Sequence, residues 1–292
     1  MHQSVLLEEV LALLDPLPGQ VVVDATLGNG GHALEILKRI GPQGRLIGID
    51  QDPEAIKRAK ENLKSFSRVD YIHENFSRLD QILISLNLRH VDAVLLDIGI
   101  SSEQLEVASR GFSFMKEGPL DMRMNPSGPI TAKDLVNDLS QEELENLFWK
   151  YGEERWGRRI AYAICEERLK SPIETTDALV RIIQKAVPKR FHFKGKHPAT
   201  RVFQALRIKV NEELESLDQA LSKVPALLSK GGRFAVISFH SLEDRKVKQT
   251  FRAWADKKEM KLLTKKAVKP TEVEIEKNPR SRSARLRVVE KI

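Results

Sequence analysis

Two acidic residues and a group of glycines stand at the spacing typical of a nucleoside-binding turn. An apolar, β-branched run ends in Asp24, and Gly28, Gly30 and Gly31 follow it closely. A second apolar run ends in Asp50, about 20 residues beyond the turn. Glycines let a ligand approach the backbone, and an acid at that distance can accept hydrogen bonds from ribose hydroxyls. The pattern predicts a β-turn-α-β unit that holds a nucleoside cofactor.

The glycine pattern alone fits two classes of cofactor. Gly28, Gly30 and Ala33 satisfy the G-x-G-x-x-G/A fingerprint, so an NAD-dependent oxidoreductase is one alternative. Asp24 argues against it, because a carboxylate beside the turn would repel a pyrophosphate. S-adenosyl-L-methionine carries no phosphate, and its sulfonium and ammonium groups are cations that a nearby carboxylate would attract. We therefore expect this cofactor beside Asp24, although the residue could instead only end its strand and hydrogen-bond the turn.

Alternating strand and helix patterns place these residues at one edge of a sheet. Strand patterns at 21–26, 46–50, 69–74 and 91–98 alternate with helical patterns at 33–40, 53–64 and 78–86. Near-continuous apolar strands predict a mostly parallel sheet with helices on both faces, and ligands bind at the carboxyl ends of such strands. Asp24, Asp50, Phe76 and Asp97 fall at or just beyond those ends, so we expect them to converge.

A different pattern begins after Asp97. Residues 108–198 show helical patterns only, at 153–170 and 176–186 and after a capping box of Ser140 and Glu143. The sheet pattern resumes with a helix at 199–229 and strands at 233–240, 260–266 and 284–290, and a capped helix is expected at 4–14. We therefore predict an α/β sheet domain of residues 1–107 and 199–292, with an inserted helical subdomain at 108–198.

The charge distribution favours a polyanionic partner. The net charge is +7 and the pI is near 9.4. Cations for phosphates and aromatic faces for bases are typical of single-stranded nucleic-acid binding, although two solvated basic faces would look alike. The first basic segment contains Lys185, Lys189, Arg190, Phe191, His192, Phe193, Lys194, Lys196 and Arg201, and the second contains Arg280, Arg282, Arg285 and Arg287.

The composition, with 41% hydrophobic and 30% charged residues, is that of a globular chain with enough apolar material for a core. The N-terminal residues show no secretory signal, and no segment is typical of a membrane span. The single cysteine, Cys165, excludes an internal disulfide and a cysteine zinc cluster. We expect a cytoplasmic protein with no membrane association and no metal site, whose oligomeric state the sequence leaves open.

Several sequence blocks resemble one family along nearly the whole chain. The chain resembles the bacterial 16S ribosomal RNA cytosine-N4 methyltransferases (the RsmH/MraW family), which are class I S-adenosylmethionine-dependent methyltransferases. The glycine turn is shared by many methyltransferases, whereas the later blocks are specific to this family. The blocks are residues 2–10, 24–32, 95–105, 110–115, 118–124, 151–155, 197–201, 238–245 and 278–283.

The resemblance implies a Rossmann-like class I fold, S-adenosyl-L-methionine as cofactor, and a cytidine in the decoding region of 16S ribosomal RNA as substrate. The partner would be free 16S ribosomal RNA or the small ribosomal subunit. A ribosome-assembly protein that binds RNA without catalysis is the other alternative. For the site, the resemblance implies that Gly30, Gly31 and His32 line the methionine end, Asp50 binds the ribose, Phe76 packs on the adenine, and Asp97 and Gln104 close the pocket.

The chemistry requires help for a poor nucleophile. The lone pair of a cytosine amine is delocalised, so a nearby proton acceptor should assist the transfer. Asp97 is the first candidate base, with cofactor positioning as its alternative role. His240 ends the resumed strand and is the second candidate, with a structural role as the alternative. Phe112, Phe114 and Met115 are candidates to stack a flipped-out base, or else fix the insert to the sheet domain.

Overall fold

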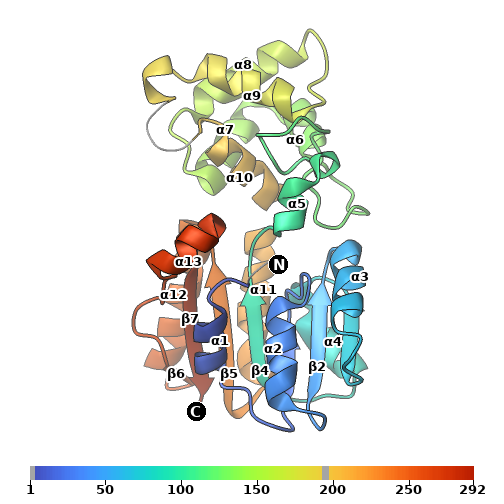
Figure 1. Cartoon of the computed structure of the whole chain (residues 1–292). Coiled ribbons are helices and arrows are strands. Elements are labelled where there is room, and N and C mark those ends of the chain that lie inside the picture. Colours follow the sequence, from blue (N-terminus) through green and yellow to red (C-terminus); the bar gives the residue numbers. More distant parts are fainter. Residues whose placement is uncertain (1–3, 193–196) are drawn as a thin grey trace. The chain divides into compact units, whose positions relative to one another are not determined.

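The computed structural model describes residues 4–192 and 197–292 and forms two compact units (Figure 1). The first unit consists of Met1–Gly99 and Leu214–Ile292, and the second of Ile100–Glu213. These boundaries differ from the expected ones at 107/108 and 198/199. The second boundary shifts because the helix that follows residue 199 packs closely on the helical unit. At Gly152 the two backbones approach so closely that a Cβ would lie 2.6 Å from the carbonyl oxygen of Arg201.

The first unit contains a mostly parallel sheet. Within the described residues seven strands pair in the order β3-β2-β1-β4-β5-β7-β6. Strands β1 to β5 are parallel, and β7 runs antiparallel to both β5 and β6. The strands are β1 Val21–Asp24, β2 Arg45–Asp50, β3 Val69–His73, β4 Val91–Asp97, β5 Leu228–Ser238, β6 Met260–Leu262 and β7 Arg285–Lys291.

Both faces of this sheet are buried. Consecutive strand residues point to opposite faces, and both sets pack against helices. Val22 and Leu95 pack with one group of helices, whereas their neighbours Val23 and Leu96 pack with the other. Burying each such aliphatic side chain contributes about 1.5–3 kcal/mol. The first helix group is α1 Leu7–Leu14, α2 Gly31–Ile40 and α3 Pro53–Asn62, and the second is α4 Leu79–Ser85, α11 Glu213–Leu227 and α12 Ser241–Asp256.

The second unit is helical, as the sequence predicts. The capping box of Ser140 and Glu143 is present, with the Ser140 hydroxyl accepting the Glu143 N–H and the Glu143 carboxylate accepting the Ser140 N–H. Apolar side chains such as Leu144, Phe148 and Ile183 are fully buried between the helices. The helices are α5 Ser102–Glu106, α6 Ala132–Asp138, α7 Gln141–Gly152, α8 Gly157–Arg168, α9 Thr176–Ala186 and α10 Thr200–Val210.

Several predicted elements differ from the structure, among them the strand expected at 233–240, which begins at Leu228, and the helix expected at 153–170, which begins at Gly157. The first helix begins at Leu7 after a left-handed Leu6, without the side-chain cap expected from Ser4. The strand expected at 260–266 ends at Leu262. The helix expected at 199–229 is interrupted at Asn211, whose side chain bonds the carbonyl oxygen of Met122 and the N–H of Met124. These long-range bonds replace helix continuation, which local sequence patterns do not reveal.

The remaining elements are short. Helix α13 spans Glu272–Lys277 in the first unit, and a 3-10 helix at Phe76–Arg78 follows β3. In the part of the chain that the structure covers, no helix has the length and apolar character needed to cross a bilayer.

Candidate cofactor-binding and catalytic site

The glycine turn joins β1 to α2. Its backbone is held by hydrogen bonds from the N–H of Leu27 to the carbonyl of Ile49 and from the N–H of Gly30 to the carbonyl of Leu27, both 2.8 Å. Gly28 and Gly30 have φ angles of 53° and 82°, in the left-handed region that favours glycine. Gly30 is also the N-cap of α2. The conformation of the turn therefore accounts for two of the predicted glycines.

Asp50, the last residue of β2, is bound to this turn. Its carboxylate accepts the N–H of Gly28 and the N–H of Asp52, each at 2.8 Å. Burial raises its pKa to about 6, although the two backbone hydrogen bonds oppose the rise. A carboxylate has about four lone-pair positions, so Asp50 keeps acceptor capacity for two hydroxyl groups. The predicted ribose acceptor thus stands beside the glycine turn.

Asp24, the last residue of β1, is buried. Burial raises its pKa to about 7, a hydrogen bond from the N–H of Thr26 lowers it, and the charge of Asp50 raises it. The bond to Thr26 is the turn contact that a purely structural Asp24 would also make. Two acids at adjacent strand ends nevertheless create a negative potential at the turn, which favours a cationic ligand.

Asp97 ends β4 and extends the same negative region. Burial raises its pKa to about 8, with repulsion from Asp24 and Glu243 adding to the effect. Its Oδ1 is buried and has no hydrogen-bond partner among the described residues. Its Oδ2 lies 3.7 Å from Nδ1 of His32. An under-bonded buried carboxylate is costly, so this site is suited to an additional donor or cation.

His32 connects Asp97 to the N-terminal segment. The ring is buried, and its Nε2 lies 3.0 Å from the carbonyl oxygen of Val5. Ser4 packs against Gly31, since a Cβ on that glycine would come within 2.2 Å of the Ser4 hydroxyl oxygen. The segment before α1 therefore covers the start of α2. The resemblance places Gly31 and His32 at the methionine end of the cofactor. In the structure both residues also contact the segment before α1.

Phe76 follows β3 and lies next to the end of β2. The N–H of Glu74 donates to the carbonyl of Asp50, and the side-chain amide of Asn75 donates to the Gln51 side chain. Asn75 also caps the 3-10 helix that begins at Phe76. The Phe76 side chain is 9% exposed and packs into the core below α4. Packing on adenine would use the small part of its ring that remains accessible.

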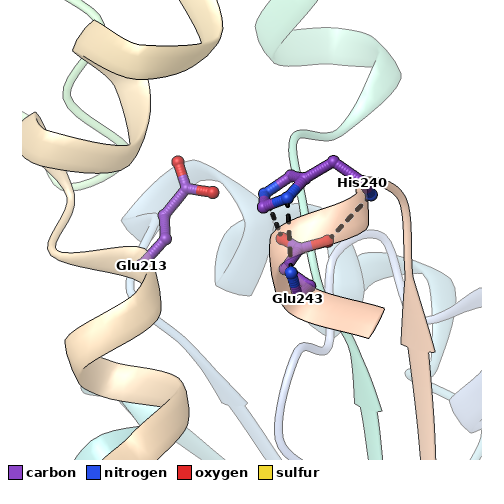
Figure 2. Close-up of side chains that lie close together, drawn as sticks. All are labelled: Glu213, His240 and Glu243. Atoms are coloured by element: carbon purple, nitrogen blue, oxygen red, sulfur yellow. Dashed lines mark hydrogen bonds and ion pairs between the residues drawn. The ribbon is translucent and has the colours of Figure 1, made fainter. Parts of the chain in front are cut away.

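His240 and Glu243 form a capping box at the start of α12 (Figure 2). Nδ1 of His240 accepts the N–H of Glu243, and Nε2 lies 3.0 Å from Oε1 of Glu243. The other Glu243 oxygen accepts the N–H groups of Phe239 and His240. Both ring nitrogens of His240 therefore face Glu243, which supports a positioning role. Glu213, the third residue drawn, forms an ion pair with Arg207 within the second unit.

Gln104 lies in the second unit and is part of another capping box. Its side-chain oxygen accepts the N–H of Ser101, and its own N–H donates to the Ser101 hydroxyl. The residue is buried at the start of α5. The role that the structure shows for Gln104 is to begin the helix that follows β4. A contact with the cofactor stays a prediction.

The three candidate base-stacking residues differ in accessibility. Phe114 stacks on His197, with ring centroids 4.9 Å apart, and meets the edge of Phe203. Phe112 is buried, whereas Met115 is 77% exposed. Of these three side chains Met115 is the most exposed, and Phe114 is half-buried.

The two basic segments are used differently. Phe193, Lys194 and Lys196 lie outside the described residues. In the C-terminal segment, Arg285 and Arg287 form ion pairs with Asp244 at 2.9 and 2.8 Å, and Arg287 is buried. For Arg287 the expectation of an open basic face is wrong, because its buried side chain holds β7 to α12, whereas Arg285 pairs with the same acid but stays exposed.

Sequence reasoning missed Glu243 and the contacts of Ser4 and Val5. Glu243 stands three residues after His240, which is capping-box spacing with histidine in place of the usual serine or threonine. This spacing could have predicted the pairing of Glu243 with His240 from the sequence. The contacts of Ser4 and Val5 with α2 had no local signal.

The strand order, the glycine turn and the acids that end β1, β2 and β4 define a class I methyltransferase fold. The MraW methylase family matches residues 1–292, and the chain belongs to that family.

Named relatives match along nearly their whole length. The "Ribosomal RNA small subunit methyltransferase H" of Halothermothrix orenii is 48% identical, covering 100% of this chain and 98% of the relative. The protein of that name from Geobacter sp. (strain M21) is 51% identical with the same coverage. The crystal structure of a "putative rRNA-methylase" from Clostridium thermocellum aligns over 100% of both chains, with 16% identity and a TM-score of 0.49.

Proposed function

We propose that this protein transfers a methyl group from S-adenosyl-L-methionine to the exocyclic N4 of a cytidine in the decoding region of 16S ribosomal RNA. Full-length identity of 48–51% to proteins named as small-subunit ribosomal RNA methyltransferases supports the activity. The observation that carries the cofactor assignment is the group of acids at the carboxyl ends of the strands. Among the described residues, no lysine or arginine forms an ion pair with Asp24, Asp50 or Asp97.

The residues of the first unit fit S-adenosyl-L-methionine. Asp50 retains acceptor positions for the two ribose hydroxyls, and at Gly28 no described atom beyond its chain neighbours lies within 4 Å of where a Cβ would stand, which leaves room for a ligand at that point of the turn. Burial raises the pKa values of Asp24 and Asp97, and repulsion from neighbouring acids adds to the rise. A cationic ligand would relieve their repulsion. A pyrophosphate would increase it, which argues against the NAD alternative.

When bound, S-adenosyl-L-methionine supplies an electrophilic methyl group on a sulfonium. As the amine nitrogen bonds to that carbon, the sulfur–methyl bond breaks and leaves a neutral thioether, while positive charge develops on the nitrogen and its proton becomes acidic. A bound cation favours the ionised form of Asp97, which can then accept this proton, because a buried carboxylate with a raised pKa is a stronger base than an exposed one. His240 orders the neighbouring strand end through Glu243. We therefore assign the base to Asp97 and a positioning role to His240.

The proposed substrate also implies which partner the protein binds and in which cell compartment it acts. Either free 16S ribosomal RNA or the assembled small subunit would present the cytidine, and both place the protein in the cytoplasm. The inserted helical unit is the proposed site of RNA recognition, since its exposed cations can contact phosphates.

The direct test incubates the protein with tritiated S-adenosyl-L-methionine and small subunits that lack the modification. Nucleoside analysis should then show N4-methylcytidine as the labelled product. Naked 16S ribosomal RNA in a parallel reaction distinguishes the two substrates. Label in another nucleoside would refute the N4 assignment, and binding without methyl transfer would favour a non-catalytic assembly role.

The test of the base uses Asp97→Asn, which keeps the shape but removes the charge. Single-turnover methylation at saturating cofactor should slow by about 10²–10⁴. If Asp97 only positions the cofactor, the cofactor KM should rise while the saturated rate stays nearly unchanged. His240→Asn, which preserves a capping side chain, is the matched variant and should retain most of the rate.

A further inference from the structure

A basic groove lies on the helical unit and includes residues that the sequence patterns did not single out. It has a volume of about 510 Å³ and lies between the start of α7, the first half of α8 and the end of α9. Its walls include Gln141, Arg158, Arg159, Tyr162 and Lys185. The volume falls within the ~300–1,000 Å³ typical of sites that hold small organic groups.

The cations of this groove are available for a ligand. Arg158, Arg159 and Lys185 are exposed, and in the described part of the chain no acidic side chain forms an ion pair with any of them, although Lys185 is close enough to Glu167 to lower the pKa of that acid. The described walls contain no acidic residue. Three positive charges around one concavity are complementary to two or three successive phosphates.

Aromatic side chains complete the pattern. Tyr162 is 55% exposed on the groove wall, although a ring of this size usually buries more of its surface. Next to it, Arg159 lies over the ring of Trp156 at 5.7 Å, and Trp156 packs against Phe191 at 5.3 Å. Arg190 in turn lies over Phe191 at 5.0 Å. These contacts link the groove to the basic segment that begins at Lys185.

We propose that this groove binds a single-stranded segment of the RNA substrate, with Arg158, Arg159 and Lys185 on its phosphates and Tyr162 stacked on an unpaired base. The inference rests on the proposed function and assigns part of its substrate-binding surface. A single strand fits better than a duplex, because a duplex exposes phosphates but no base faces on which Tyr162 could stack.

The first experiment measures binding of a fluorescein-labelled single-stranded RNA of about 12 nucleotides, a length suited to single-strand sites. The triple variant R158A/R159A/K185A should bind at least tenfold more weakly at low salt. Its slope of log Kd against log salt should fall by up to about 2, since each lost single-strand phosphate contact removes about 0.7. An unchanged slope would overturn the proposal.

The matched control is R252A/K257A/K261A, which removes three exposed cations from the first unit. It should leave the slope near the wild-type value, and an equal loss in the control would show that total charge, rather than the groove, governs binding. Tyr162→Ala should weaken binding about tenfold, while Tyr162→Phe, which keeps the ring, should not. Equal weakening of duplex RNA by Tyr162→Ala would contradict base stacking.

Two further measurements separate this inference from the proposed function. Calorimetric binding of S-adenosyl-L-methionine should be the same in wild type and the triple variant, which confirms a folded first unit. The wild type should methylate small subunits, whereas the triple variant should need several-fold more subunit for half-maximal rate. If the wild type itself does not methylate subunits, the proposed function fails; if both proteins share one KM, the groove assignment alone fails.

Discussion

Asp97 should destabilise the cofactor-free protein, so that Asp97→Asn makes it more stable at alkaline pH. Burial of the carboxylate, with added repulsion from Asp24 and Glu243, raises its pKa from 3.8 to about 8. An acid whose pKa is higher in the folded state binds more protons when folded. The free energy of unfolding therefore falls as the pH rises from about 4 to about 8.

The magnitude follows from the same values. A pKa of about 8 instead of 3.8 corresponds to an upper limit of about 5 kcal/mol at pH 8, at about 1.4 kcal/mol for each pKa unit. Because 23% of the Asp97 side chain is exposed, solvent and neighbouring groups reduce this effect. We expect a measured gain of about 2–3 kcal/mol for Asp97→Asn at pH 8, and a much smaller gain near pH 4.5.

The assay is urea denaturation of the cofactor-free proteins across pH 4.5–8.5, followed by tryptophan fluorescence. Asp256→Asn, on the exposed end of α12, is the control and should change the free energy of unfolding little at either pH. Saturating S-adenosyl-L-methionine should stabilise wild type more than Asp97→Asn, since the cation offsets the Asp97 charge. The reasoning is refuted if the stability difference between Asp97→Asn and wild type does not grow with pH.

Three further predictions concern the turn, the N-terminal segment and the helical unit. Asp50→Ala should weaken S-adenosyl-L-methionine binding by about 1.5–3 kcal/mol, because it removes acceptors for two hydroxyl groups, and calorimetry that shows unchanged affinity would exclude Asp50 as the ribose ligand. Gly31→Ala should displace the Ser4 hydroxyl, which would lie 2.2 Å from the new Cβ, and lower the melting temperature; unchanged amide exchange near Ser4 would argue against this packing. Ser140→Ala removes an N-cap and should lower the free energy of unfolding by about 1 kcal/mol, whereas a loss below the error of denaturant titration would show that the cap contributes nothing.

The sequence alone determined the order of the strands along the chain and the residues at their ends. Apolar runs that end in Asp24, Asp50 and Asp97 predicted a parallel sheet with acids at one edge, because buried parallel strands have a near-continuous apolar pattern. The glycine turn was predictable for a similar reason, since Gly28 and Gly30 adopt φ angles that other residues avoid. The capping box at Ser140 was equally local.

Only the tertiary structure decided how those residues interact. The pKa of Asp97 depends on burial and on Asp24 and Glu243, which lie far from it in the sequence. The interruption at Asn211 depends on bonds to the loop at Met122, and the groove depends on three helices packing together. Local patterns report backbone preference and burial on one face, whereas these features arise from contacts between distant segments, whose partners a single sequence does not specify.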